Sequence, residues 1–410
     1  VEEVAYTWFN RLIAIRFMEV NDYLPSGIRV LSSENRAKNE PDFVTSPFDT
    51  DLEFTDCEQE EIIRNKEENR LDDLFRMLFI KQCNKLHDIL PELFEVTDDY
   101  TELLLTISFT DKDGIVYRLV HDIDEDDFNV EKEGQVEIIG WMYQYYISQK
   151  HEEVIDPLHG KTIKKADIPA ATQLFTTDWV VRYMVDNSLG RYWIERNPQS
   201  RLAEKLDFFV TPKNGEISYI DEKIYPAELT FLDPCMGSGH ILVYAFDVLM
   251  EIYRECGYSD RDAALSIIEN NLYGIDIDNR AYQLAYFAVM MKARSYDRRA
   301  LTRGVIPNIA AVTETNGIEK FECEGVTSDL SNNVTGSHLI KVYNDAKETG
   351  SLVTVEHHNY DEFEEYLDNC EMNGQLTFES SRWFENVLPV MRRLVKQVKI
   401  MERKYSVVCT

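Results

Sequence analysis

The feature that most constrains the fold of this chain is residues 229–242, which read LTFLDPCMGSGHIL. A short apolar run that favours β structure ends at Asp233. It is followed by Gly237 and Gly239, and an apolar helical pattern begins at Ile241. This order predicts a strand, a tight glycine turn and a helix. Small residues let a ligand approach the backbone closely, and the start of a helix offers free N–H groups. The stretch therefore predicts a ligand-binding turn in an α/β fold.

The spacing of the acidic residues indicates which ligand this turn binds. A dinucleotide site needs a third glycine and an acidic residue about 20 positions further on. Here the third glycine is absent, and the acidic end of the next strand, in residues 272–278 (LYGIDID), places Asp276 39 positions after Gly237. Asp233 would also bring negative charge to the place of a pyrophosphate. A ligand with an ammonium group and a ribose, such as S-adenosylmethionine, suits the two aspartates better. A βα turn without a ligand is disfavoured because the glycines lack an evident packing reason.

The motifs resemble those of a known family. The turn DPCMGSGH and the strand GIDID resemble motifs I and II of the S-adenosylmethionine-dependent N6-adenine DNA methyltransferases. Residues 173–185 (QLFTTDWVVRYMV) resemble motif X, which precedes motif I in the γ-type order of that family. Thr177 stands where the family usually has proline, and we expect Thr176 to cap the helix that follows. Residues of about 130–310 are most similar to the adenine methyltransferases of bacteriophage-exclusion (BREX) defence systems.

The resemblance implies a Rossmann-like methyltransferase domain, incomplete in this chain, that binds S-adenosylmethionine. It places Thr176 and Phe175 beside the methionine part of the cofactor, and Asp233 near its amino group. It also assigns Cys235, Gly237 and Gly239 along the turn, Asp276 at the ribose and Ile277 at the adenine ring. Residues 307–314 (PNIAAVTE) read as the third strand, and Glu314 at its end is the candidate for the adenine amino group. His240, directly after the glycines, is expected to cap or pack the helix start.

The catalytic motif of the family is missing from this chain. In the family, an (Asn or Asp)-Pro-Pro-Tyr turn after the fourth strand binds the flipped adenine. No such tetrapeptide occurs in the 410 residues, although residues 405–410 (YSVVCT) read as a strand of the kind that precedes it. We therefore expect no catalytic residue here, and a chain that stops just before that motif. The prediction is the cofactor-binding N-terminal portion of a site-specific DNA adenine methyltransferase of a phage-defence or restriction-modification system, inactive by itself.

Charge and composition bear on the partners. The chain carries 74 acidic against 43 basic side chains, a net charge of −31, which opposes tight binding to phosphates. We expect double-stranded DNA as a partner of the full-length protein, weak DNA binding by this chain, and defence-system proteins as further partners. The basic residues between 392 and 404 are interpreted as the solvated face of a sheet-covering helix rather than as a DNA surface.

The cysteine, histidine and apolar patterns argue against disulfides, a metal site and a membrane span. The seven cysteines are scattered without a C-x-x-C pair, and the adjacent His357 and His358 would not converge on one ion, so we predict neither disulfides nor a metal site. No apolar run is long enough to span a membrane. These patterns indicate a cytoplasmic protein.

Two domains are predicted. Residues 1–168 form a mainly helical domain with an acidic segment at about 91–140, where fifteen acidic residues face three basic ones and where 103–109 and 115–120 read as strands. Residues 169–410 form the methyltransferase domain. It includes an insert at about 202–226, predicted as a hairpin around Asn214-Gly215, and an unassigned insert at about 315–384.

Three other functions remain open from the sequence. Motifs I and II report the cofactor and not the acceptor, so a methyltransferase acting on RNA, protein or a small molecule is one alternative. A second is a cofactor-binding scaffold or regulatory subunit of a defence complex. A restriction nuclease is the third, but Pro41-Asp42 is followed by no convincing Glu-x-Lys or Asp-x-Lys.

Overall fold

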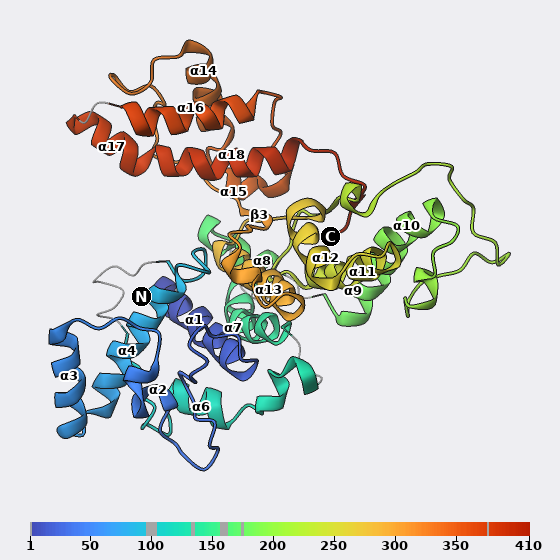
Figure 1. Ribbon diagram of the computed structural model, residues 1–410. Coiled ribbons are helices and arrows are strands. Elements are labelled where there is room, and N and C mark those ends of the chain that lie inside the picture. The colour runs from blue at the N-terminus through green and yellow to red at the C-terminus, as the bar shows by residue number, and fades with distance from the viewer. Residues whose placement is uncertain (1, 96–104, 133–135, 156–162, 174–175, 375–376) are drawn as a thin grey trace. The chain divides into compact units, whose positions relative to one another are not determined.

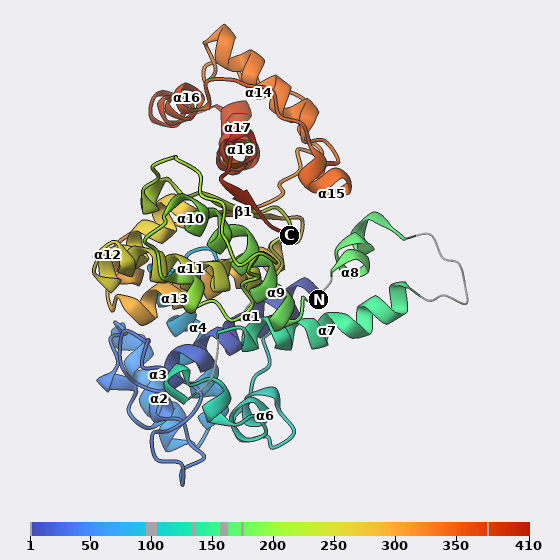
Figure 2. The same ribbon diagram turned by 90° about the vertical axis from the view of Figure 1, so that its right-hand side faces the viewer.

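The computed structural model describes residues 2–95, 105–132, 136–155, 163–173, 176–374 and 377–410 (Figures 1 and 2). The chain divides into two compact units. The first comprises Val1–Tyr143 and Tyr286–Gly304, and the second comprises Gln144–Ala285 and Val305–Thr410. The predicted division between residues 168 and 169 stays a prediction.

The first unit is helical in its described residues. Its helices are α1 (Glu2–Val20), α2 (Asp42–Thr45), α3 (Asp56–Glu67), α4 (Leu71–Leu86) and α6 (Ile115–His121), with the short turns η1 (Pro47–Asp49), η2 (Glu125–Asp127), η3 (Val130–Lys132) and η9 (Ala300–Thr302). Helix α7 (Ile138–Val154) begins in this unit and ends in the second, and α13 (Asn279–Tyr296) begins in the second and ends in the first. The mainly helical character predicted for this part of the chain is thus present.

The described residues of the acidic segment do not form the two predicted strands. Residues 115–120 lie in helix α6, which starts after Gly114 and buries Val116 and Leu119 on one face. The described part of the other stretch, residues 105–109, contains no strand either. A short apolar run does not distinguish a strand from one buried helical turn, and here the spacing of three between the buried residues selects the helix.

The second unit is built on a four-stranded parallel sheet with the order β3-β2-β1-β4. Its strands are β1 (Phe231–Asp233), β2 (Leu272–Asp276), β3 (Asn308–Ala311) and β4 (Val407–Val408). Asp233 pairs with Gly274 in the register of β1 and β2, so the carboxyl ends of these strands lie at the same edge. Parallel strands need crossover connections, and between β1 and β2 these are α11 (His240–Glu255), α12 (Asp260–Ser266) and η8 (Ile267–Asn271). The unit is a small α/β structure.

Further helices precede and follow this sheet. Before β1 come η4 (Lys165–Asp167), α8 (Ile168–Thr172), α9 (Asp178–Val185), η5 (Asp186–Gly190), α10 (Arg191–Arg196), η6 (Leu202–Glu204) and η7 (Pro226–Glu228). Between β3 and β4 come α14 (Leu330–Val342), α15 (Ala346–Thr349), η10 (Gly350–Leu352), α16 (Tyr360–Asn373), α17 (Phe378–Asn386) and α18 (Leu388–Glu402). Figures 1 and 2 show α14 to α18 gathered in one group, drawn in orange and red.

Helix α18 covers the sheet, as its apolar stripe predicts. Its Leu394 and Val398 are fully buried in one hydrophobic cluster with Ile275 of β2 and Ala310 of β3. The same cluster includes residues of α14, α16 and α17, so the predicted insert at 315–384 shares the core of the sheet. The sheet-covering interpretation of α18 is confirmed.

The predicted hairpin is wrong in its strands and correct in its turn. Gly215 has φ +75° and donates its N–H to the Pro212 carbonyl oxygen at 2.8 Å, but the flanking residues form no strands. Instead, the N–H groups of Val210 and Ile220 donate to Asn187 Oδ1 at 2.8 Å and to the Glu195 carbonyl oxygen at 2.7 Å. Because these backbone groups bind to η5 and α10, they are not available to pair with each other.

Among the described residues, no helix combines the length and the apolar character that crossing a membrane requires.

Candidate functional site

The turn after β1 is held against the end of β2. The N–H of Met236 donates to the carbonyl oxygen of Ile275 at 3.1 Å, beyond the ladder of the two strands. Gly274, within β2, makes this approach possible, because a Cβ atom there would lie 2.6 Å from Met236 Sδ and 2.9 Å from Leu242 Cδ1. The glycine of the LYGID strand therefore serves the packing of the turn.

The two glycines of the turn have different reasons to be glycine. Both have positive φ, +52° at Gly237 and +88° at Gly239. A Cβ atom at Gly239 would lie 3.0 Å from Cα and Cβ of Ala285, so this residue has the packing reason that the sequence did not reveal. A Cβ atom at Gly237 would meet nothing within 4 Å. The backbone of Gly237 therefore faces open space, as a residue beside a ligand would.

Asp233, the last residue of β1, is fully buried and incompletely bonded. Its Oδ1 accepts the N–H of Cys235 at 3.1 Å, while its Oδ2 is buried and has no hydrogen-bond partner. Burial, together with the charge of the nearby Asp276, raises the pKa of this carboxyl to about 7. A buried oxygen without a donor is costly in a folded protein, which marks this atom as a place for a ligand donor.

Asp276, the last residue of β2, lies at the same edge of the sheet. Its Oδ2 accepts the N–H of Gly237 at 2.8 Å, and its Oδ1 accepts the N–H of Asp278 at 2.8 Å. Burial raises the pKa of this carboxyl to about 6, against the effect of these hydrogen bonds. Each carboxylate oxygen has a second lone pair that can accept from a hydroxyl group. Asp276 thus links the turn to β2 and keeps acceptor capacity.

The start of α9, the motif X region, lies next to the start of α11. Oδ1 of Asp178 is 3.6 Å from Nε2 of His240, and α9 packs along α11 (Figures 1 and 2). His240 is the first residue of α11 and is 8% exposed, which supports the packing half of its predicted role; Gly239 is the N-cap. The fold therefore brings the residues after Thr176 to the glycine turn, as the motif order predicts.

The predicted cap of α9 is not formed by Thr176. The N-cap is Thr177, whose side chain makes no capping hydrogen bond, and Thr176 precedes it as a half-buried residue. Phe175 lies outside the described residues. The assignment failed by one position, because the helix begins at Asp178 and the residue directly before it takes the extended N-cap conformation.

The other predicted site residues, Cys235, Ile277 and Glu314, differ in exposure and in their contacts. Cys235 is exposed beside Asp233. Ile277 follows Asp276, and its Cγ2 would lie 3.3 Å from a Cβ atom at Gly350, so the η10 backbone borders it. Glu314 is engaged elsewhere: its Oε1 lies 3.1 Å from Lys165 Nζ and accepts the N–H of Lys347 at 3.1 Å. In the described part of the chain, Glu314 makes no hydrogen bond or ion pair with Asp233 or Asp276.

One neighbour of the turn was missed in the sequence. The N–H of Cys409 donates to the Leu232 carbonyl oxygen at 2.9 Å, which places Cys409 beside the end of β1. Burial and the Asp233 charge raise the pKa of its thiol to about 11. The apolar strand pattern before it was visible, but the pairing of β4 with β1 at this edge needed the sheet order.

Comparison with known proteins agrees with these motifs. The chain is 43% identical to the adenine-specific methyltransferase PglX of Lacticaseibacillus casei over 433 aligned positions, which cover 100% of this chain and 35% of that protein. It is also 43% identical to the adenine-specific methyltransferase BrxX of Escherichia coli, over 77% of this chain and 26% of that protein. A putative type II restriction enzyme and methyltransferase of Methanocaldococcus jannaschii is 25% identical over 75% of this chain. No family model matches the chain.

These matches confirm the resemblance that the motifs carry. The chain is similar along its full length to adenine-specific methyltransferases, and its α/β unit with an added helical part is consistent with such proteins. The chain spans about a third of the length of PglX and about a quarter of BrxX.

Proposed function

We propose that this chain is the S-adenosylmethionine-binding portion of a site-specific DNA adenine N6-methyltransferase of a phage-defence or restriction-modification system. Its second unit would be the incomplete Rossmann-like domain of that enzyme. The observation that carries the proposal is the buried Oδ2 of Asp233, which has no hydrogen-bond partner and lies at the carboxyl edge of a parallel sheet. Ligands of open α/β sheets bind at this edge.

The residues around Asp233 suit the functional groups of the cofactor. An ammonium group can donate to the free Oδ2, and the negative charge of the aspartate would stabilise it in this buried place. Ribose hydroxyls can donate to Asp276, whose oxygens each keep a lone pair. The backbone of Gly237 faces open space and can lie against the cofactor. Thr176, Phe175, Cys235 and Gly239 complete the set around the methionine part.

The adenine end of the cofactor would lie near Ile277. The side chain of this residue is partly buried against the cluster under α18, and η10 borders it. Both contacts of Glu314 use Oε1, so Oε2 is the atom that we propose as an acceptor for the adenine amino group. That role requires Glu314 to act while it is bound to Lys165.

When bound, the cofactor supplies an electrophilic methyl group, and the residues described here only bind and orient it. We propose that they do not bind the target base, because no (Asn or Asp)-Pro-Pro-Tyr sequence occurs in the chain. Positioning of the reactants accounts for roughly 7–11 kcal/mol of barrier lowering in well-oriented reactions. The isolated chain should therefore be inactive on DNA, the proposed substrate of the whole protein.

Titration calorimetry with S-adenosylmethionine tests the cofactor site. We expect one binding site per chain, lost or greatly weakened in Asp233→Asn, which removes the charge that holds the ammonium group. Asp221→Asn removes the same charge from an exposed residue and should bind like the unaltered chain. A folded chain that gives no heat at saturating cofactor, or an Asp233→Asn variant that binds equally well, would refute the proposal.

Transfer of a labelled methyl group to phage DNA tests the acceptor. We expect no labelling by the 410-residue chain and N6-methyladenine from the longer parent protein. Labelling of adenine by both at similar rates would show that residues of this chain hold the base. Labelling of RNA or protein, and not of DNA, by the parent would favour the alternative acceptor.

A further inference from the structure

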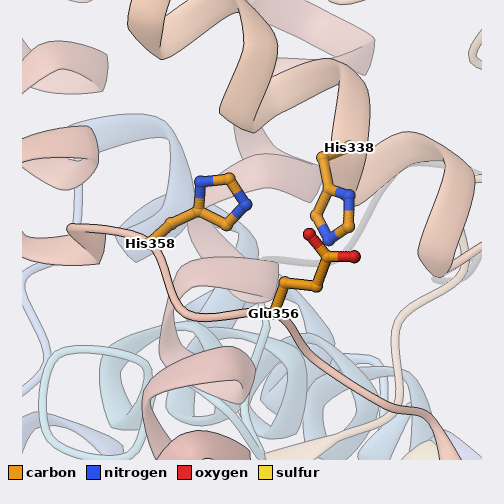
Figure 3. A group of neighbouring side chains, drawn as sticks. All are labelled: His338, Glu356 and His358. Carbon is orange, nitrogen blue, oxygen red and sulfur yellow. The ribbon is translucent and has the colours of Figure 1, made fainter.

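A second group of chemically active side chains lies far along the chain from the cofactor turn. His338 belongs to α14, and Glu356 and His358 belong to the segment that leads into α16. One ligand atom from each lies within 4.8 Å of the others, and Figure 3 shows both rings and the carboxylate turned toward one another. The two imidazole rings have centroids 5.1 Å apart and planes inclined by 39°.

The contact of His358 with Thr335 leaves its other ring nitrogen available. Thr335 Oγ1 lies 3.3 Å from Nδ1 of His358 and also 3.3 Å from the carbonyl oxygen of Ser331. The hydroxyl can accept from a protonated Nδ1 while it donates to Ser331, and Nε2 of His358 then keeps a free lone pair. Metal-binding histidines are commonly oriented in this way by a partner on the other ring nitrogen.

The other histidine has an unsatisfied nitrogen. Nε2 of His338 is buried from solvent and makes no hydrogen bond. A buried polar atom of this kind is unfavourable unless it finds a partner. His338 and Thr335 are three residues apart on α14 and so share one face of the helix. The same helical face thus holds one ligand directly and orients the second.

The segment that carries the remaining two side chains is fixed at both ends. The hydroxyl of the buried Tyr360 donates to the carbonyl oxygen of Glu356 at 2.7 Å, and the N–H of Tyr360 donates to the carbonyl oxygen of His358 at 3.0 Å. Asn359 caps α16 by accepting the N–H of Glu362 at 3.2 Å. These bonds fix the segment to the start of α16 without any contribution from the three side chains, and α16 packs against α14 in one hydrophobic cluster.

We propose that His338, Glu356 and His358 bind a divalent transition-metal ion, Zn²⁺ by preference. Two imidazole nitrogens and one carboxylate oxygen are ligands that Zn²⁺ takes at about 2.0–2.2 Å, with water in the fourth tetrahedral position. Such bond lengths place neighbouring ligand atoms roughly 3.4 Å apart. The present separations of up to 4.8 Å must therefore shrink by about 1.4 Å at most, and the exposed side chain of Glu356 is free to turn inward. Mg²⁺ prefers oxygen ligands and does not match this set.

The bound ion would connect α14 to the segment before α16. It would therefore stabilise the region between β3 and β4, separately from the cofactor turn, and the inference does not depend on the proposed function. Sequence reasoning missed the group because it considered the adjacent His357 and His358. His338 and Glu356 come from positions whose proximity only the fold establishes.

Zinc titration of the tag-free 410-residue chain, stripped with a chelator, tests the site. We expect one Zn²⁺ per chain by calorimetry, and a Co²⁺ derivative with the visible absorption of a tetrahedral nitrogen and oxygen site. His338→Ala should weaken binding on the order of 100-fold or more. The matched control is His357→Ala, which removes a neighbouring histidine that is 90% exposed and should leave affinity unchanged.

Two outcomes would overturn the proposal. The first is a folded chain that binds no Zn²⁺ in stoichiometric amount. The second is a His338→Ala variant, or the exposed-site variant Glu356→Gln, that binds as tightly as the unaltered chain. Glu356→Gln keeps size and shape at an exposed residue, so it tests the ligand set even if His338→Ala fails to fold. Titration with S-adenosylmethionine in parallel distinguishes loss of this site from loss of the cofactor site.

Discussion

Two buried carboxylates, one in each unit of the chain, differ in how completely they are bonded. Oε1 of Glu19, in α1, accepts from Arg16 at 2.7 Å and from Ser32 Oγ at 2.9 Å. Its Oε2 accepts the N–H groups of Val30 and Leu31, each at 2.8 Å. Asp233, equally buried, has one hydrogen bond, and its Oδ2 has none. Two equally buried carboxylates of this molecule therefore differ in whether every oxygen has a donor.

The difference has a physical consequence for each carboxylate. A buried charge is stable when a partner charge and donors replace its water, as Arg16 and three further donors do for Glu19. Asp233 has no cationic partner among the described residues. Burial, and to a smaller extent the charge of the neighbouring Asp276, raises the pKa of Asp233 to about 7. We infer that Glu19 stabilises the fold, while Asp233 is retained for a ligand at a cost to stability.

The largest effect is expected at Glu19. Glu19→Ala removes the nearer carboxylate of the buried Arg16 guanidinium, which keeps only Glu125 at 3.5 Å, and it leaves the N–H groups of Val30 and Leu31 without their acceptor. Removing one partner of a buried pair costs about 3–5 kcal/mol. Urea unfolding followed by circular dichroism should show this loss. A loss below about 1 kcal/mol would mean that the hydrogen bonds of Glu19 do not stabilise the fold, and that Glu19 does not differ from Asp233 in this respect.

The pH dependence of the free energy of unfolding should show that Asp233, unlike Glu19, destabilises the fold when it is charged. Its folded pKa of about 7 lies above the ordinary value of 3.8, so the folded state holds a proton that the unfolded chain has released. Stability therefore falls as the pH rises from about 4 to about 7, by about 1.36 kcal/mol per unit. Between about pH 5 and pH 7 this amounts to roughly 2 kcal/mol, because the slope flattens as the pH approaches the folded pKa.

The variant Asp233→Asn isolates this contribution. It should lose that part of the slope and be more stable than the unaltered chain at pH 7, although Asp276, with its pKa raised to about 6, keeps a similar slope at lower pH. Urea midpoints across this pH range give the measurement. Equal slopes in the two proteins would show that Asp233 is not a destabilising acid.

A smaller effect is expected when the ribose acceptor is removed. Asp276→Ala should weaken S-adenosylmethionine binding by about 1–3 kcal/mol, because hydroxyl donors of the ligand and the N–H of Gly237 lose their acceptor. Calorimetry measures the change, with Asp278→Ala as a neighbouring acidic control. Asp276→Asn, which keeps one oxygen acceptor, should lie between the two. Unchanged affinity in Asp276→Ala would separate Asp276 from the cofactor site.

The local pattern of strand, turn and acidic strand end singled out Asp233, Gly237 and Asp276 in the sequence. The structure brings these three residues together at one edge of the sheet, and their role in cofactor binding stays a prediction. The unused Oδ2 of Asp233 could not be predicted, since it depends on which donors β2 and β4 bring to that edge. The packing role of Gly239 against Ala285 likewise required the fold.

The errors have the same origin. The apolar residues of 115–120 are compatible with a strand as well as with the helix α6 that they form. The backbone groups on both sides of Gly215 bind to α10 and η5 because those elements lie within reach. In both cases tertiary contacts decided between local alternatives that the sequence left nearly equal.

The smallest effect is expected where charge is neither buried nor unsatisfied. Arg392 of α18, 40% exposed, donates to Asp368 at 2.7 Å and to Glu371 at 2.6 Å, both on α16. Exposed ion pairs contribute about 0–1 kcal/mol, so Arg392→Gln should change the free energy of unfolding by less than about 1 kcal/mol. Because these carboxylates already neutralise the arginine, the basic stretch should also add little to DNA affinity. A gel shift with random duplex at physiological salt should show weak binding by the unaltered chain and no further loss in the variant. Tight binding that falls with Arg392→Gln would make this helix a DNA surface, and would show that a paired charge can be functional even where no atom is left unsatisfied.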